Sequence, residues 1–214
     1  MTAKAGYDGQ MMDNRIFERA MAIIDGENAK DPTVLHVGAV EGPRELVMSR
    51  LVSAWIKRLQ ADPSPELLLA ARGTHLRRWE HPRAVYPAGR GGYLRWRTAL
   101  YGIHAAEVTR LLEEAGADVL AITRVAELVA KRVPRTDRES QTLEDALCLA
   151  FVEADLAALA GRTEDATMTR VLQKTWAKMS EAAHGYALEL ITDEEQRGLV
   201  RRALASQHRW ESSE

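Results

Sequence analysis

Arginine and aromatic side chains are concentrated in one short stretch of this sequence, residues 72 to 97. The stretch contains seven arginines, no lysine and a single acidic residue, Glu80. Aromatic side chains are interleaved with the arginines at Trp79, Tyr86, Tyr93 and Trp96. A guanidinium group can bind a phosphate or a carboxylate through two hydrogen bonds and can stack on an aromatic ring. This composition favours the binding of an anion.

We therefore expect this stretch to bind an anionic small molecule or a nucleotide. The expected binding residues are Arg72, Arg77, Arg78, Trp79, Arg83, Tyr93, Arg95, Trp96 and Arg97. Single-stranded RNA is an alternative ligand, because its bases could stack on the tryptophans. The arginines could instead form ion pairs with acids of neighbouring helices, or face solvent.

Two histidines and one aspartate are candidate metal ligands. His75 lies late in one apolar helical segment, His104 lies in the middle of another, and Asp145 lies in a third. Imidazole and carboxylate groups suit Zn, Fe or Mn, so these side chains could share a divalent metal. No pair of them has the four-residue spacing of a helical zinc motif, and each could be a hydrogen-bonded core residue instead.

Candidate acids and bases lie close to the arginine-rich stretch. Glu80 is the nearest candidate general base, and His81 or His184 could act as the acid. No motif indicates an organic cofactor. A Gly-rich segment at 88–92 lacks the spacing of a phosphate-binding P-loop.

Helix signals follow one another along the whole chain. Asp13, Ser64 and Asp118 are placed as N-caps, and Gly116 is placed as a C-terminal stop. The prolines and glycines of 82–92 predict a loop, which a helix from 93 to 115 should follow. This succession predicts an all-α protein that folds as a single-domain helical bundle.

Two further helix starts are expected from capping boxes, in which a threonine is followed three residues later by an acid. They are Thr142 with Asp145, and Thr192 with Glu195. Residues 34–40 form the only strand candidate, and a weak one.

The bulk composition is that of an ordinary globular domain. The chain has 214 residues, a net charge of −2 and 46% apolar residues, which excludes a disordered protein. We expect one domain over residues 13–208, with an N-terminal tail at 1–12 and a C-terminal tail at 209–214. A single cysteine, Cys148, and the absence of a signal peptide or a long apolar span favour a cytoplasmic protein without membrane contact. The oligomeric state does not follow from these features.

Several motifs resemble a bacterial family of unknown function. They are Thr74 to Arg83 with Tyr86-Pro87, Gly92 to Arg97, Thr142 to Asp145, and Lys174 to Ser180. Some members of that family carry a glutamyl-tRNA synthetase label. The chain has no alternating strand and helix pattern of a nucleotide-binding α/β domain, so the label is not extended to it.

The order of the helical segments also resembles the HD superfamily of metal-dependent phosphohydrolases, which are helical bundles. Segments 45–59 and 67–76 are each similar to one of its helices, and 104–129 is similar to its auxiliary His helix and the helix after it. Leu143 to Ala146 matches the segment of its late metal-binding Asp. Of its ligands, His75, His104 and Asp145 are present, whereas Met48 to Arg50 and Leu76 replace others.

The HD resemblance implies an HD-domain-like bundle with a divalent metal at His75, His104 and Asp145. Such a protein would hydrolyse a phosphorylated small molecule or a nucleotide with metal-activated water, while the arginines neutralise phosphate charge. The alternative is a non-catalytic module of the same fold that binds an anion, a nucleotide or RNA.

Overall fold

The computed structural model of the chain describes residues 12–134 and 136–211, with side chains up to residue 205. Most of the two predicted tails therefore lies outside the described residues. The described part is helical apart from one small hairpin, which confirms the all-α prediction. Its helices are α1 (Asn14–Asn28), α2 (Arg44–Leu59), α3 (Pro65–Gly73), α4 (Gly89–Ala115), α5 (Val119–Val129), α6 (Arg138–Ala154), α7 (Leu156–Ala160), α8 (Asp165–Trp176), α9 (Glu181–Leu190) and α10 (Glu194–Glu211).

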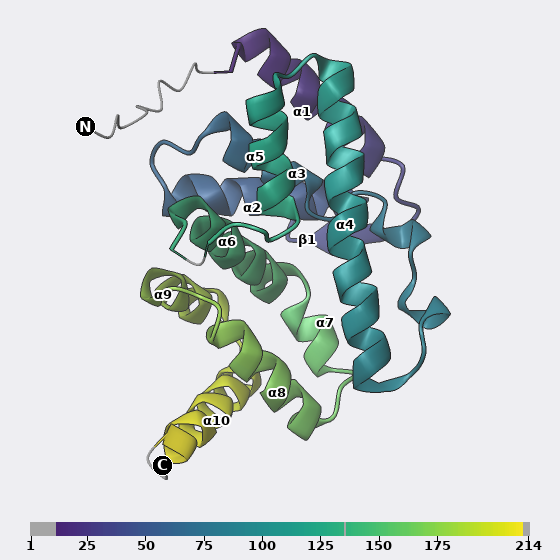
Figure 1. Cartoon of the computed structure of the whole chain (residues 1–214). Coiled ribbons are helices and arrows are strands. Elements are labelled where there is room, and N and C mark those ends of the chain that lie inside the picture. Colours follow the sequence, from purple (N-terminus) through teal and green to yellow (C-terminus); the bar gives the residue numbers. More distant parts are fainter. Residues whose placement is uncertain (1–11, 135, 212–214) are drawn as a thin grey trace, which may run out of the picture.

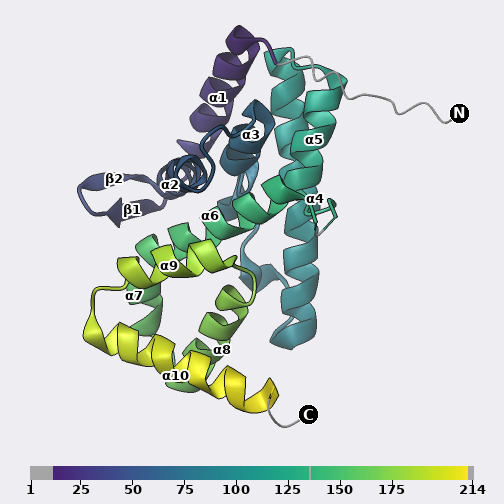
Figure 2. The same cartoon turned by 90° about the vertical axis from the view of Figure 1, so that its left-hand side faces the viewer.

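The helices form one bundle that is built around the crossing of α2 and α6. Helices α1 and α5 lie at one end of the molecule and α8 and α10 at the other, with α2 and α6 between them (Figures 1 and 2). The long helix α4 runs beside α5 and reaches down toward α8. Within the described residues, no helix combines the length and the apolar character that a bilayer span requires.

Local capping chemistry explains where several helices begin and end. Asp13 accepts from the backbone N–H of Arg15 at 2.7 Å, and Ser64 accepts from that of Leu67 at 3.0 Å. Asp118 caps α5 in the same way, which satisfies N–H groups that have no partner within the helix. Gly116 has a φ of 84° and ends α4. These four predicted boundaries are confirmed.

Other boundaries differ from the prediction. Helix α6 begins at Arg138, because Asp137 accepts from the N–H of Ser140 and acts as its N-cap. Thr142 and Asp145 consequently lie inside the helix, and the capping box expected there is wrong. The last helix is capped at its start by Asp193, which accepts from the N–H of Gln196, one position after the predicted cap.

The strand candidate at 34–40 is part of an antiparallel hairpin. Strand β1 (Val34–Val37) pairs with β2 (Val40–Pro43), and Gly38 has a φ of 58° in the tight connection. The second strand ends at Pro43 and runs directly into α2. Helix α4 starts at Gly89, four residues earlier than predicted, and α3 ends at Gly73.

A close approach between α3 and α4 holds the two histidines in neighbouring positions. A Cβ atom on Gly73 would lie 2.7 Å from Cγ2 of Val108, a buried side chain on α4. The last turn of α3 can therefore pack against α4 only with glycine at this position. His75 follows two residues after Gly73, and His104 lies one turn before Val108 on α4.

Candidate functional site

A cavity of about 320 Å³ opens between α2, α4 and α6 and is completed by the end of α3, the end of α5 and the segment after α8. We call it the central cavity. Its volume is in the range of pockets that bind small ligands. Five cationic side chains line it: Arg44, Arg78, Arg97, Lys131 and Lys178. Three acids line it as well: Glu45, Glu144 and Asp155. Cations therefore outnumber acids in the lining.

Two of the cavity arginines are held by aromatic side chains. The guanidinium carbon of Arg78 lies 5.0 Å from the centroid of the Trp96 ring, and the ring of Tyr93 lies 5.9 Å from that of Trp96. Arg97 donates from Nε to the hydroxyl oxygen of Tyr101 at 2.6 Å. In the part of the chain that the structure describes, neither arginine has a carboxylate within ion-pair distance. Their guanidinium groups are therefore not occupied by a contacting carboxylate, although Glu45 and Glu144 interact with them electrostatically from a greater distance.

The acids on the α6 side of the cavity are neutralised by ion pairs. Asp155 pairs with Arg44 at 2.5 Å, and Glu144 pairs with both Lys131 and Lys178. Burial would raise the pKa of Glu144, but the two lysines outweigh it and hold the pKa below its usual value. Glu144 is therefore ionised at neutral pH and its charge is compensated on two sides.

Both candidate histidines line the central cavity. Their ring centroids are 6.0 Å apart, and the rings meet edge to face. Nδ1 of His75 lies 3.4 Å from a carboxylate oxygen of Glu45, a residue that is 5% exposed. Burial would raise the pKa of Glu45, but His75 and Arg78 outweigh it and lower the pKa. The pair thus combines an ionised carboxylate with an imidazole that is one-third exposed.

His104 is buried and stays neutral. Its Nδ1 lies 2.8 Å from the carbonyl oxygen of Leu76, which fixes the orientation of the ring. Burial, aided by the nearby His75, lowers the pKa of His104 to about 3. The thiol of Cys148, also at the cavity, has its pKa raised to about 12 by burial and by Glu144, and it is protonated at neutral pH.

Asp145 does not lie at the central cavity. One carboxylate oxygen accepts from the backbone N–H of Ser180 at 2.8 Å and from Gln141 at 2.9 Å. The other accepts from the Ser180 hydroxyl at 2.6 Å. The side chain therefore ties α6 to the start of α9.

The structure therefore does not gather the three ligands that the HD resemblance implies. His75 and His104 are neighbours, whereas Asp145 is occupied elsewhere. In residues 12–134 and 136–211 no group of three or more His, Cys, Asp or Glu side chains is arranged to hold a metal ion. The side chains present therefore do not fit a His–His–Asp metal site.

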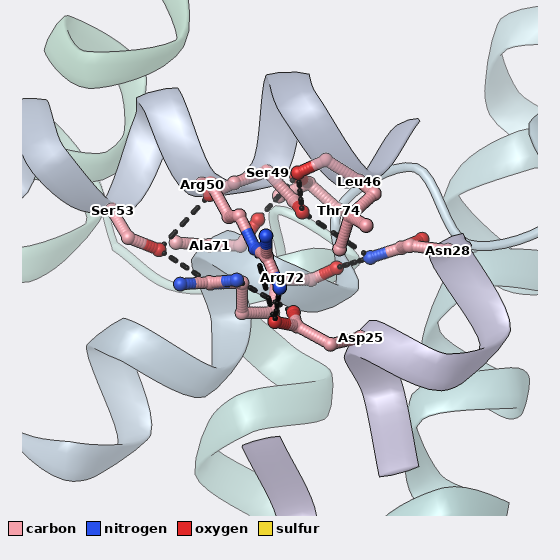
Figure 3. A network of polar contacts seen from close by, with 9 residues as sticks. All are labelled: Asp25, Asn28, Leu46, Ser49, Arg50, Ser53, Ala71, Arg72 and Thr74. Carbon is pink, nitrogen blue, oxygen red and sulfur yellow. Dashed lines mark hydrogen bonds and ion pairs between the residues drawn. The ribbon is translucent and has the colours of Figure 1, made fainter. Parts of the chain in front are cut away.

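Arg72 does not line the cavity and lies in a polar network that joins α1, α2 and α3 (Figure 3). It donates to Asp25 of α1 at 2.6 Å and to Ser53 of α2 at 2.9 Å. Asn28 of α1 donates to the carbonyl oxygen of Arg72 at 2.9 Å and to Ser49 at 3.3 Å. For Arg72 the structure thus shows the internal ion pair that was the alternative to anion binding, and the network fixes the end of α3 that leads to His75.

Several other predicted binding residues also lie outside the cavity lining. Arg77 pairs with Glu27 at 3.1 Å and lies near Glu80, with 3.8 Å between its Nη1 and a Glu80 oxygen. Arg83 donates to the carbonyl oxygens of Tyr86 and Pro87, each at 2.8 Å, and clamps the loop before α4. Trp79 is half-buried and Arg95 is exposed, and neither lines the cavity.

The three predicted acid and base residues are not at the cavity either. Glu80 is exposed and approaches Arg77. His81 contributes its carbonyl oxygen, which accepts from Nε1 of Trp96 at 2.9 Å. His184 stacks on Trp176, with 5.6 Å between ring centroids, and Nε2 lies 2.9 Å from the Trp176 carbonyl oxygen. His81 thus supports a cavity residue, whereas His184 serves the packing of α8 and α9.

Six of the eight charged residues that line the cavity were missed by reasoning from the sequence. The missed residues are Arg44, Glu45, Lys131, Glu144, Asp155 and Lys178. A signal existed for two of them, because Glu144 and Lys178 lie inside the motifs that resemble the family of unknown function. Lys131 carried another signal, since it stands where a helix normally ends on glycine.

Comparison with known proteins places the chain in a family. The model of the family described as "Domain of unknown function (DUF4202)" matches residues 18–200. No curated protein and no solved structure matches the chain. The match covers most of the sequence and includes every cavity residue, so the chain belongs to the DUF4202 family.

Proposed function

We propose that this DUF4202 protein binds a phosphorylated small molecule or a nucleotide in the central cavity. The observation that carries the proposal is the set of contacts that Arg78 and Arg97 make. Both line the cavity, both contact aromatic side chains, and neither is paired with a carboxylate among the described residues. Partly buried guanidinium groups that lie outside ion-pair distance of a carboxylate attract an anion that can accept two hydrogen bonds, and phosphate is such an anion.

The rest of the lining is consistent with this ligand. Lys131 and Lys178 share one carboxylate, Glu144, so part of their positive charge is uncompensated. Trp96 and Tyr93 offer aromatic faces beside the arginines, on which a nucleobase could stack. The volume of about 320 Å³ suits a ligand of mononucleotide size or smaller better than an RNA strand.

Paired substitutions on α4 test the proposal. Arg97 lines the cavity, whereas Arg95 is exposed on the same helix two residues away, so Arg97→Gln and Arg95→Gln remove the same charge in different places. Titration with AMP and with inorganic pyrophosphate should show that Arg97→Gln weakens binding by about tenfold or more, since a hydrogen bond to a charged group contributes about 1.5–3 kcal/mol.

The control variant, Arg95→Gln, should differ from Arg97→Gln in both ligand affinity and the salt dependence of binding. Arg95→Gln should stay within about twofold of the wild type, because a distant exposed charge is largely screened. The slope of log Kd against log salt should fall only in Arg97→Gln. Equal effects of the two substitutions would contradict binding in the cavity and would favour a surface site, such as the RNA-binding alternative.

Hydrolysis of the bound phosphate ester is a second candidate, and the Glu45–His75 pair favours it. The imidazole of His75, whose Nδ1 lies 3.4 Å from the Glu45 carboxylate, is the candidate group to take a proton from the attacking water. The resemblance to the metal-dependent HD phosphohydrolases bears on this second candidate only. Release of phosphate from a panel of phosphate esters, compared between wild type and His75→Gln, tests it. The same preparation, purified without chelator, should be assayed for Zn, Fe and Mn.

A further inference from the structure

One ring nitrogen of His104 has no hydrogen-bond partner. A carbonyl oxygen can only accept, so Nδ1 must carry the proton that is donated to Leu76 at 2.8 Å. In a neutral imidazole the other nitrogen, Nε2, is then a bare acceptor. Within the described residues Nε2 is buried and unpaired, and the side chain as a whole is 2% exposed.

An unpaired buried acceptor is costly, and most buried polar atoms in proteins have a partner. Protonation cannot relieve this one, because His104 is neutral above about pH 3 and Nε2 remains an acceptor. The His104 ring lines the central cavity beside His75. A ligand in the cavity could therefore supply the missing donor.

The neighbours of His104 restrict the kind of donor. Glu45 is ionised, lies 3.4 Å from Nδ1 of His75 and interacts electrostatically with His104, so the lining near His104 includes a carboxylate acceptor. An ammonium group would be attracted to Glu45, but Arg44 and Arg78 lie close to the same carboxylate and would repel it. A neutral hydroxyl group donates a hydrogen bond without that repulsion.

We propose that the ligand of the central cavity is a phosphate ester with a free hydroxyl group, which donates to Nε2 of His104. The ligand class is then a polyol or sugar phosphate, or a nucleotide that is recognised through its ribose. This inference rests on the proposed binding of phosphate by Arg78 and Arg97, and it adds a residue that selects among phosphate esters.

Glycerol 3-phosphate and n-propyl phosphate form a matched pair of probes, because they share the phosphate and the three-carbon chain and differ in the hydroxyl groups. Calorimetric titration of the wild type should show glycerol 3-phosphate binding about 3- to 10-fold more tightly, which is the net contribution of one hydrogen bond. Ribose 5-phosphate and AMP, titrated alongside, distinguish a sugar phosphate from a nucleotide.

His104→Asn is the informative variant. An asparagine amide can still donate to the Leu76 carbonyl, but no acceptor remains at the position of Nε2. The preference for glycerol 3-phosphate should fall below about twofold, while the affinity for n-propyl phosphate stays unchanged. His184→Asn, which alters a histidine outside the cavity, should keep the full preference.

A measurement on the wild type covers the case in which His104→Asn does not fold. Long-range ¹H–¹⁵N NMR should show Nε2 of His104 as an unprotonated nitrogen, and its signal should move upfield with glycerol 3-phosphate but not with n-propyl phosphate.

The outcomes separate the two proposals. If both probes bind the wild type equally, or if His104→Asn keeps the preference, a trapped water satisfies Nε2 and the hydroxyl inference is overturned, whereas phosphate binding stands. If neither probe nor pyrophosphate binds, the proposed function itself is overturned, and the hydroxyl inference with it.

Discussion

Lys131 has a backbone conformation that normally belongs to glycine. It follows the last residues of α5 with a φ of 54°, and the N–H groups of Lys131 and Arg132 bond to the carbonyls of Leu128 and Glu127. This is the Schellman pattern of a helix end, and Gly116 takes the same place at the end of α4. A residue with a Cβ atom is strained there by about 1–2 kcal/mol. The Lys131 side chain reaches the central cavity, where it pairs with Glu144.

Two substitutions separate the backbone strain from the charge. Lys131→Gly and Lys131→Ala both remove the ion pair with Glu144, and because both partners are partly exposed this costs at most about 1 kcal/mol. Only glycine also relieves the strained backbone. Lys131→Gly should therefore be about 1 kcal/mol more stable than Lys131→Ala and close to the wild type. Both variants should bind AMP and pyrophosphate more weakly, and to the same extent.

Urea denaturation and thermal unfolding measure the stability difference. For a chain of this size, about 1 kcal/mol corresponds to roughly 2–4 °C in Tm. Ligand titration on the same preparations measures the loss of binding. If Lys131→Ala were as stable as Lys131→Gly, the strain would be absent. If both variants bound as tightly as the wild type, Lys131 would have no part in the site.

Three further predictions concern packing, a buried carboxylate and pH. Gly73→Ala should lower the free energy of unfolding by about 1–3 kcal/mol, because the added methyl group overpacks against Val108. Gly26 lies at an exposed helix position with open space around it, so Gly26→Ala should raise the free energy of unfolding by up to about 1 kcal/mol. Urea denaturation midpoints of the two variants measure the difference. Asp145→Asn should cost about 1–3 kcal/mol, because an amide NH2 replaces one of the two oxygens that accept from Ser180, yet it should leave AMP affinity unchanged. Altered affinity would refute the structural role of Asp145. The wild type should lose stability as pH falls from about 6.5 toward 3, by at most about 1.4 kcal/mol per pH unit. The cause is that His104 takes up a proton in the unfolded chain but not in the folded protein. The free energy of unfolding of His104→Asn should depend less steeply on pH.

The fold could be predicted from the sequence wherever the deciding interaction is local. Asp13, Ser64 and Asp118 lie within three residues of the N–H groups that they cap, so their spacing alone identified the helix starts. The start of α6 was misplaced because Asp137 and Thr142 are both acceptable caps. A contact distant in sequence favours Asp137, since Arg124 pairs with it at 2.8 Å.

The site was predicted less well because composition does not show which arginines are already paired. Arg72 and Arg77 looked the same as Arg78 and Arg97 in sequence, and all four lie in the same stretch. Their partners decide the difference, and these partners come from α1, more than forty residues earlier: Asp25 binds Arg72 and Glu27 binds Arg77. Arg78 and Arg97 meet aromatic rings instead. Structural pairing is thus the correct description for Arg72 and Arg77, whereas anion binding stays a prediction for Arg78 and Arg97.

The HD resemblance indicated the carboxylate of Asp145, whereas the carboxylate that reaches the cavity belongs to Glu144, the preceding residue of α6. Successive residues of a helix point about 100° apart. Asp145 consequently faces the start of α9, while its neighbour Glu144 faces the cavity and meets Lys131 and Lys178. A carboxylate between two ammonium groups is a poor source of net negative charge for a cation. The same arrangement leaves the lysines with surplus positive charge beside Arg97, which is the electrostatic basis for expecting an anion in this cavity.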